Sequence, residues 1–422
     1  MQAPKSLVFT VFLIGSNHKL LTYPTNIARR FCKAIQEITF AFGFGGTLMK
    51  IISLFNNKGG VGKSTLSYHL GCALGVMGKR VLFVDLDPQC NLTISAMFED
   101  ELEEIWKEED PYMDDYSDAI SMHPEHNLFA SPRSVHFLLK PVEEGFSDFE
   151  TLPPAKKVSE NVYILPGRLS LHKFESKISE RWNGLYQGES LSIRTVTAFR
   201  TLCEKYAERY DIEYVIVDTS PSLGIMNKTI ISTVDGFFIP TFPDMFSLYG
   251  IKNIGNSLAL WQKEFNTIYN LISDNKISKF PKKFVQFIGF TIYNAKKYTA
   301  QKNPNPYNLA TAHYRYALLI PQTIRDNIKE QNIAPIPSEQ IYQPIGGLSV
   351  MYTHNTYPSV AQSLKCPMWS VPEVYTKMKQ QNPEYLNENQ ISVNNGLFSN
   401  YRDTLGAYIK FAEDLISRME AL

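Results

Sequence analysis

The chain has 422 residues, of which 44% are hydrophobic and 20% are charged, and its formal net charge is zero. This composition agrees with a globular cytosolic enzyme that buries one large core, or a core with an accessory lobe. The five cysteines are odd in number and contain no C-x-x-C pair, which argues against a disulfide framework or a zinc site. No segment approaches the roughly 20 apolar residues of a membrane-spanning helix, so no membrane association is expected.

Residues 1–48 are predicted to be an extension that precedes the folded domain. They contain one short apolar run, 7–14, which faintly resembles a secretory signal but is not followed by a clear small-residue cleavage site. Met49 lies close before the first predicted strand and reads as a natural start. We therefore expect 1–48 either to precede the native start or to be poorly ordered.

The first predicted elements are an apolar strand at 51–55, a glycine-rich loop and a helix from Leu66. The loop reads Lys58, Gly59, Gly60, Val61, Gly62, Lys63, Ser64 and Thr65. Strand, glycine loop and helix in this order are the context of a phosphate-binding loop. The glycines let backbone N–H groups point at phosphate oxygens, and the helix N-terminus adds partial positive charge. We expect Lys63 to reach the β- and γ-phosphates and Ser64 to contact Mg²⁺, so the predicted cofactors are ATP and Mg²⁺.

Two later strands are predicted to end in carboxylates. The apolar run 81–84 leads into Asp85 and Asp87, and the run 214–217 leads into Asp218. A carboxylate at the C-terminal end of a parallel strand lies where α/β proteins bind their ligands. One such strand is weak evidence, but a phosphate-binding loop followed by both strands is strong evidence for a nucleotide site.

These motifs, in this order, resemble those of the ParA/MinD family of ATPases. The additional lysine at Lys58 is typical of that family's deviant Walker A loop, and 85–89 is similar to its DxDPQ segment. The stretch 214–224 is similar to its Walker B strand, hhhhDTPPSLG, with Ser220 in place of the first proline.

The resemblance implies roles for individual residues. Lys58 would cross to the phosphates of a second, nucleotide-bound subunit and stabilise the transferred phosphoryl group. Asp87 would orient the attacking water, Asp85 would support the Mg²⁺ shell, and Asp218 would contact Mg²⁺ through water.

Further downstream the resemblance is less specific. The stretch 235–250 is similar to a family strand and helix start, and 287–294 is similar to the next core strand. The resemblance implies that Asn294 contacts adenine. It also implies that 318–325, read as the family's IPxxxR stretch, closes the nucleotide pocket around Pro321.

Two segments are biased in charge in opposite directions. Residues 99–118 hold eleven acids and one lysine, which is typical of a solvated or disordered loop, with a partner-docking or DNA-mimicking arm as the alternative. Residues 276–302 contain seven lysines and no acid. By resemblance this basic window binds double-stranded DNA without sequence preference, through the phosphates. The candidate DNA contacts are Lys282, Lys283, Lys296 and Lys297, and the alternative is that these lysines are merely solvated.

The C-terminal part, 331–422, is predicted to be an extension of the ATPase domain. Its first section, 331–396, is rich in proline and tyrosine and matches no motif, so we expect irregular structure on the surface. The stretch 405–419 has one apolar helical face. Its polar face lacks the basic excess of a membrane-binding helix, so we expect it to pack on the core.

We predict a doubly wound α/β fold with a mainly parallel sheet, in which 49–330 form a P-loop ATPase domain of the deviant Walker A type. The expected function is that of a cytoplasmic ParA-like ATPase. It would form a homodimer with ATP, bind DNA in the nucleoid, and hydrolyse ATP slowly under the control of a ParB-like activator, to partition DNA or position cargo. The alternative is an ATP-dependent assembly switch that docks a partner protein and does not bind DNA. A metabolic ligase or kinase is less favoured, because no small-substrate motif is present and Lys58 argues against it.

Overall fold

Seven strands form one sheet in the part of the chain that the computed structural model describes, which comprises residues 49–122, 126–146, 152–298 and 305–422. The strand order is β3-β4-β2-β5-β1-β6-β7. All neighbouring strands are parallel except β3 and β4 at one edge. The strands are β1 Lys50–Leu54, β2 Val81–Asp85, β3 Lys156–Ser159, β4 Val162–Leu165, β5 Tyr214–Asp218, β6 Gly236–Thr241 and β7 Gln286–Ile292.

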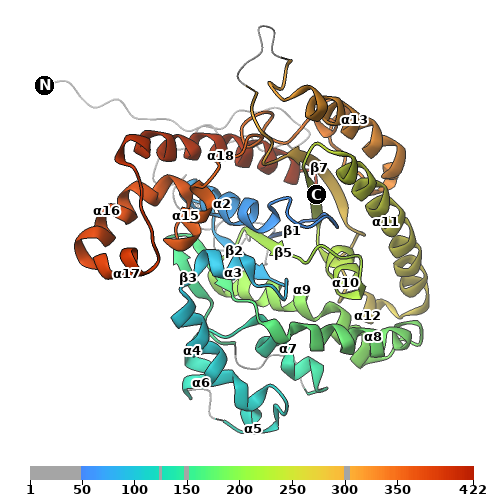
Figure 1. Ribbon diagram of the computed structural model, residues 1–422. Coiled ribbons are helices and arrows are strands. Elements are labelled where there is room, and N and C mark those ends of the chain that lie inside the picture. The colour runs from blue at the N-terminus through green and yellow to red at the C-terminus, as the bar shows by residue number, and fades with distance from the viewer. Residues whose placement is uncertain (1–48, 123–125, 147–151, 299–304) are drawn as a thin grey trace, which may run out of the picture. The chain divides into compact units, whose positions relative to one another are not determined.

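Helices connect the strands and cover both faces of the sheet (Figure 1). The helices are α2 Lys63–Val76, α3 Asn91–Ala96, α4 Glu99–Glu109, α5 Ser117–Ile120, α6 Asn127–Ala130, α7 Val135–Glu143, α8 His172–Tyr186, α9 Ser190–Tyr210, α10 Ile225–Thr233, α11 Met245–Leu271, α12 Asp274–Ile277, α13 Thr311–Asn327, α14 Ser338–Ile341, α15 Tyr357–Ser363, α16 Val371–Gln381, α17 Pro383–Glu388 and α18 Phe398–Met419. The predicted doubly wound α/β fold is therefore confirmed.

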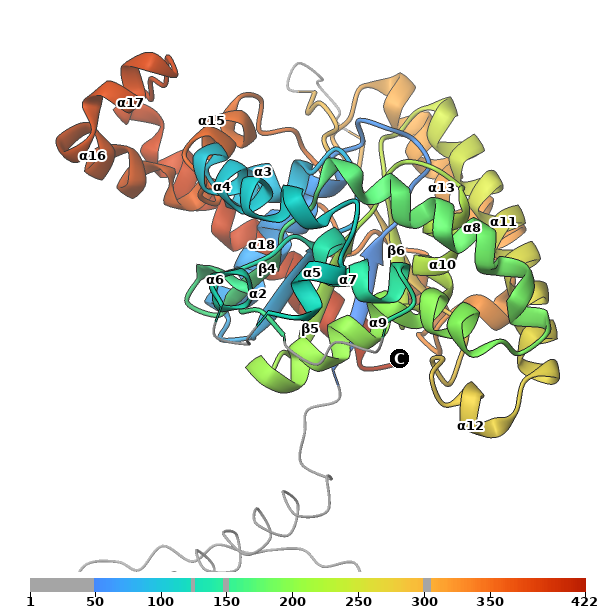
Figure 2. The same cartoon turned by 90° about the horizontal axis from the view of Figure 1, so that it is seen from below.

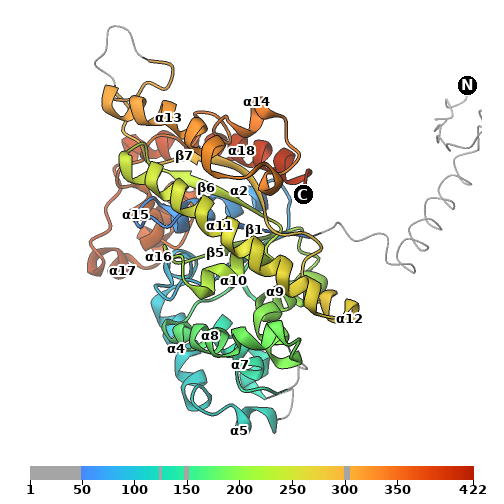
Figure 3. The same ribbon diagram turned by 90° about the vertical axis from the view of Figure 1, so that its right-hand side faces the viewer.

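The central strands are continuous apolar runs because both of their faces are buried. Side chains alternate between the faces, so Ile52 and Phe83 join the core cluster that also contains residues of α2 and α18. Gly71 lets α2 lie close to the sheet, because a Cβ there would stand 2.1 Å from a ring carbon of Phe83. At the β6–β7 edge of the sheet, α11 and α13 pack against each other (Figure 3).

Helix α18 covers α2. Tyr408, Phe411 and Leu415 are fully buried in the same core cluster as α2. The two helices run close together in Figure 1 and share many contacts. None of the described helices is long and apolar enough to cross a membrane.

The acidic stretch 99–118 differs from the expected loop, because most of it is folded into α4 and two short helical turns. Three acids occupy the first turn of α4, where their negative charges interact favourably with the positive end of the helix dipole. Glu109, at the end of α4, is fully buried and accepts hydrogen bonds from Ser134 N and Oγ, each at 2.6 Å. The acidic helix is thus anchored to the domain through its last turn.

The proline-rich stretch 331–396 consists of short helices and turns, several of which contact the core. Ile333 and Pro344 form isolated bridges to β7, at Phe287 and Phe290. Further on, α15 packs against α3, and α16 and α17 lie beyond them at the edge of the molecule (Figure 2). The predicted extension at 1–48 lies outside the described residues.

Candidate active site

The phosphate-binding loop joins β1 to α2. Gly60 and Gly62 have φ angles of 73° and 83°, a left-handed conformation that glycine adopts without strain. A Cβ at Gly62 would also stand 2.5 Å from a ring carbon of Tyr293, so both backbone and space require glycine there. Helix α2 begins directly after Gly62, and its first N–H groups have no intrahelical partners. The loop therefore presents the N–H groups and helix terminus that bind an anion.

Lys63 is held inside this loop. Its side chain is 7% exposed, and its Nζ donates a hydrogen bond of 3.1 Å to the carbonyl oxygen of Asn56. Burial lowers the pKa of Lys63, while the nearby charges of Asp218 and Asp87 act to raise it. An ammonium group carries three donors, so Lys63 has capacity for phosphate oxygens.

Asp218 ends β5 in an environment suited to a cation. The residue is fully buried, and neither carboxylate oxygen has a hydrogen-bond partner of good geometry among the described residues. Burial raises the pKa of Asp218, and the proximity of Ser64 and Lys63 partly offsets this rise. An unpaired buried carboxylate is costly, and Mg²⁺ is commonly held by one or two carboxylates together with nucleotide phosphates. Asp218 and Ser64 therefore fit the predicted Mg²⁺ site.

Asp85 lies opposite Asp218 on the neighbouring strand. One of its oxygens accepts hydrogen bonds from Thr93 N at 2.8 Å and Thr93 Oγ1 at 2.7 Å, and the other accepts from Asp87 N at 3.2 Å. Burial and the charge of Asp218 raise the pKa of Asp85. In this structure Asp85 thus holds the turn that carries Asp87, and its predicted part in the Mg²⁺ shell stays a prediction.

Asp87 is largely buried at the start of that turn and accepts a hydrogen bond of 3.0 Å from Gln89 N. Its charge acts on Lys63, Asp85 and Asp218, so the three predicted carboxylates and the loop lysine form one electrostatic cluster. The cluster forms because the carboxyl ends of β2 and β5 meet beside the loop that follows β1.

Lys58 points to a partner within its own chain. Its Nζ lies 2.5 Å from Asp244 Oδ2, and both side chains are 26% exposed. The ammonium group also lies 5.2 Å and 5.8 Å from the ring centroids of Phe242 and Phe246. Asp244 caps α11 as well, because its other oxygen accepts from Ser247 N at 2.9 Å. Sequence reasoning missed Asp244, although an aspartate directly before the start of a helix is a common N-cap.

A family model described as "AAA domain" matches residues 49–271, which is more than half of the chain. The chain belongs to the ParA-like family of P-loop ATPases. It is 27% identical to the sporulation initiation inhibitor protein Soj of Bacillus subtilis, over 52% of this chain and 68% of Soj. It is 23% identical to the chromosome partitioning protein ParA of Myxococcus xanthus, over 54% of this chain and 65% of that protein. The solved structure of pNOB8 ParA is similar with 16% identity and a TM-score of 0.48, over 88% of this chain and 99% of that one.

The chain spans only 44% to 49% of the length of three further curated relatives. The family resemblance predicted from the motifs is nevertheless confirmed, because the family match covers the loop and both carboxylate strands.

The predicted adenine contact, Asn294, and the predicted pocket-closing residue, Pro321, lie in different surroundings. Asn294 follows β7 with a φ angle of 63° and lines a pocket of about 300 Å³ together with Gly62 and Thr65 of the loop. Pro321 lies inside α13, which packs against α11. The stretch 318–325, predicted by resemblance to close the nucleotide pocket, lies inside this helix. Pro321 is not among the residues that line the pocket beside the loop, and its part in the nucleotide site stays a prediction.

The predicted DNA contacts do not form one patch. Lys282 and Lys283 are exposed before β7, and Lys296 and Lys297 are exposed after it. A seven-residue strand spans roughly 23 Å, so the two pairs lie at opposite ends of the sheet edge. Lys296 and Lys297 are at the end that carries the nucleotide loop. Lys302, which belongs to the same basic window, lies outside the described residues.

A chain of polar contacts links the Asp85 turn to the acidic helix. Thr93 Oγ1 accepts from Gly167 N at 2.8 Å, and Trp106 of α4 donates to the Gly167 carbonyl at 3.2 Å. Next in the chain, Arg168 donates to Glu109 at 2.8 Å and to Ser170 at 3.1 Å. Glu109 belongs to the acidic stretch 99–118, whose composition is typical of a solvated loop. Its pairing with Arg168 in the protein interior could therefore not be recognised from the sequence.

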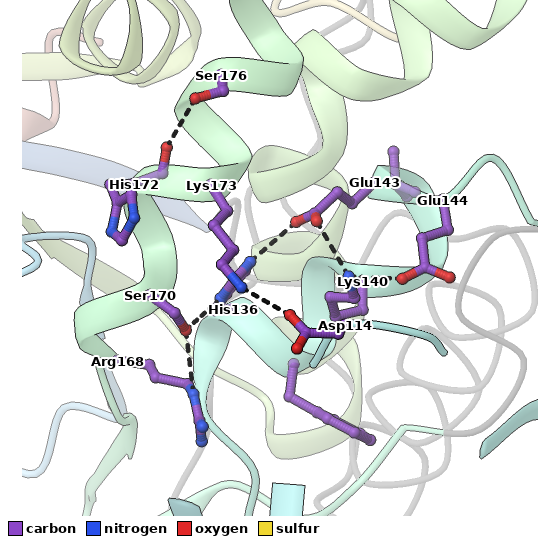
Figure 4. A network of polar contacts seen from close by, with 12 residues as sticks. Asp114, His136, Lys140, Glu143, Glu144, Arg168, Ser170, His172, Lys173 and Ser176 are labelled. Carbon is purple, nitrogen blue, oxygen red and sulfur yellow. Dashed lines mark hydrogen bonds and ion pairs between the residues drawn. The ribbon is translucent and has the colours of Figure 1, made fainter. Parts of the chain in front are cut away.

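Figure 4 shows the continuation of this chain into α7. Ser170 Oγ lies 2.7 Å from His136 Nδ1, and His136 Nε2 lies 2.9 Å from Glu143, which also accepts from Lys140 at 3.0 Å. Burial lowers the pKa of His136 despite the adjacent carboxylate. The network joins α4 to α7 through Arg168 and Ser170, which lie just before α8.

Proposed function

We propose that this chain is a ParA-like ATPase that closes into a face-to-face dimer with ATP and Mg²⁺, binds DNA without sequence preference, and hydrolyses ATP slowly to move or position DNA or other cargo. The observation that carries the proposal is the buried carboxylate of Asp218, which has no hydrogen bond of good geometry among the described residues and lies beside Lys63 and Ser64. Such a site is complete only with a cation and an anionic ligand. Family membership supports ATP as that ligand.

Different groups of the site would bind the phosphates and the Mg²⁺ ion. Backbone N–H groups of Gly60 to Thr65 and the ammonium group of Lys63 would hold the phosphates, and Asp218 and Ser64 would hold Mg²⁺. When bound, Mg²⁺ neutralises charge that develops on the transferred phosphoryl group. Asp87, fixed by the Asp85–Thr93 contacts, would orient the attacking water.

Lys58 would act on a second copy of the chain. To do so it must leave Asp244, with which it is paired here. A cationic group supplied across an interface is worth about 10³–10⁵ in rate in other phosphoryl-transfer enzymes. A ParB-like activator would then accelerate the slow step, and nucleoid association would follow from DNA binding.

The direct test is nucleotide binding and turnover by the purified chain. Lys63→Ala should abolish ATP binding, since it removes the buried cation of the loop. Asp87→Ala should retain ATP binding, lose hydrolysis and accumulate as a dimer in analytical ultracentrifugation. Normal hydrolysis by Asp87→Ala would show that this carboxylate does not position the water.

A second candidate function is an ATP-dependent switch that docks a partner protein and does not bind DNA. The separation of the two lysine pairs favours it, because four lysines at opposite ends of β7 are a weaker DNA surface than one contiguous patch. Duplex DNA binding with ATP and with ADP, measured across a salt series, separates the two. Salt-sensitive binding with ATP alone supports the partitioning function, and no binding in either state, by protein that takes up ATP, supports the switch.

A further inference from the structure

The pocket beside the phosphate-binding loop extends along α2. One of its walls is formed by Gly62, Thr65 and His69. These residues are three and four positions apart, so they follow one face of the helix from its N-terminus. A nucleotide whose phosphates lie at that N-terminus would therefore have this pocket directly beside it.

The opposite wall comes largely from the C-terminal extension. Asn355, Pro358, Ser359 and Gln362 line the pocket across from α2, together with Asn294 from the end of β7. All four lie outside the range 49–271 that the family model matches. The sequence offered no motif for this segment, and only the fold brings it to the loop.

This wall is anchored to the ATPase core on several sides. Gln362 Nε2 donates to Ser95 Oγ at 3.4 Å, and Lys365 Nζ donates to the Ile94 carbonyl at 2.8 Å. Met368 N donates to Nε2 of His69, the same residue that lines the pocket, at 3.1 Å. The wall is therefore held against both α2 and the helix that follows the Asp87 turn.

The chemistry of the pocket suits a nucleobase. Its volume of about 300 Å³ is at the lower end of the range for small-molecule sites, as expected if the phosphates are bound elsewhere. Three primary amides line it, from Asn294, Asn355 and Gln362. An amide presents a donor and an acceptor side by side, which matches the N6 and N7 edge of adenine, whereas guanine presents two acceptors there.

We propose that residues 355–362 form the base-recognition wall of the nucleotide site, with Asn355 and Gln362 selecting adenine over guanine. The inference rests on the proposed function, because it concerns the nucleotide whose phosphates the loop 59–65 would hold. It adds that the extension is part of the nucleotide site, so bound nucleotide should shield this segment from solvent.

The test is the affinity for ATP and for GTP, each with Mg²⁺, measured by isothermal titration calorimetry on the full chain. The variants are Gln362→Met, which keeps volume but removes the amide, and Asn355→Gly, which suits the φ angle of 52° at that position. Gln380→Met, on the exposed face of α16, is the matched control. We expect each pocket variant to reduce the preference for ATP about 5-fold or more, the lower limit for loss of one bidentate amide contact, and the control to keep it.

A second measurement does not depend on the two pocket variants folding. Hydrogen–deuterium exchange of residues 353–363 in the wild-type chain should slow on addition of ATP and Mg²⁺, and should not change in Lys63→Ala. If ATP binds through Lys63 but both pocket variants keep the full preference and 353–363 are not protected, the base-wall inference is overturned and the proposed ATPase stands. If the folded wild-type chain binds neither nucleotide, both fail.

Discussion

At the scale of single residues, the pairing of Lys58 with Asp244 is a contact that the proposed dimer closure would have to break. The two side chains are partly exposed, and exposed ion pairs contribute about 0.2–1 kcal/mol. The cost of breaking the pair is therefore small, and contacts of Lys58 with the phosphates of a second subunit would offset it.

The first prediction concerns this pair. Asp244→Asn keeps a residue that caps α11 but removes the charge that holds Lys58. We expect ATP-dependent dimerisation to become about 2- to 30-fold tighter, because the dimer breaks one such pair in each of its two subunits and each pair contributes about 0.2–1 kcal/mol. Sedimentation equilibrium with ATP measures it, and Asp403→Asn, an exposed change on α18, is the control. An unchanged dimer affinity would mean that Lys58 is not restrained by Asp244.

The buried aspartates give a prediction for pH dependence. Burial is the main cause of the raised pKa values of both Asp85 and Asp218. The folded chain therefore keeps these protons at a pH where the unfolded chain, with aspartate pKa values near 3.9, has lost them. The free energy of unfolding must then fall as pH rises from about 4 towards the raised pKa values.

We expect Asp218→Asn to make this fall shallower in the absence of nucleotide and Mg²⁺. The substitution removes one buried charge and also relieves Asp85 of its neighbour, so the variant should be more stable than the wild type by about 1–3 kcal/mol near pH 8. At the same time it should lose Mg²⁺-dependent ATP binding. Urea unfolding near pH 5 and near pH 8 checks the first effect, and equal pH slopes for wild type and variant would contradict it.

At the scale of elements, the acidic helix α4 is attached to the active-site turn through Arg168. Glu109 is fully buried, with Arg168 and Ser134 as its hydrogen-bond partners. Arg168 also donates to the carbonyl oxygen of Trp106 at 3.2 Å. Removing the arginine would leave the buried carboxylate without its ion-pair partner, with only the Ser134 hydrogen bonds and the nearby charge of Arg133 to stabilise it.

The third prediction follows from this burial. Arg168→Met should lower the free energy of unfolding by about 3–5 kcal/mol, as expected when one partner of a buried ion pair is removed. The double change with Glu109→Gln should recover part of the loss, because the uncompensated charge is gone. Arg402→Met is the matched control, since the pair of Arg402 with Glu373 is more than half exposed on both sides and should change stability by less than about 1 kcal/mol. Equal losses in the two arginine variants would show that the network does not anchor α4.

At the scale of the whole molecule, a net charge of zero conceals basic groups at two separate ends of β7. Dimer closure over the nucleotide would join the ends of the sheets that carry the loop. Lys296 and Lys297 lie at that end, so the joined surface would use this pair and not Lys282 and Lys283.

The fourth prediction separates the two pairs. Each phosphate contact contributes about 0.9 to the slope of log affinity against log salt concentration. Changing both Lys296 and Lys297 to Gln should therefore reduce the slope by about 1.8 for ATP-dependent duplex binding. Changing both Lys282 and Lys283 to Gln is the matched control and should leave it unaltered. The reverse pattern would place DNA at the other end of the sheet.

Much of the fold and half of the site follow from the sequence. The strand β1 is an apolar run that leads into the glycine loop, β2 and β5 are apolar runs that end in aspartate, and parallel strands must bring those ends to one edge. The loop, Lys63, Asp87 and Asp218 could therefore be placed together from local patterns alone. The family was predicted for the same reason.

The tertiary structure decided what depends on residues far apart in the chain. Asp244 meets Lys58 across 186 positions, and Met368 meets His69 across 299. Such contacts leave no periodic pattern in the sequence, because each partner lies in a different segment whose path is set by packing. The position of the two separate lysine pairs and the amide-lined wall at 355–362 arose in the same way. The sequence by itself determined the nucleotide loop and its carboxylates, and the packing of distant segments determined what surrounds them.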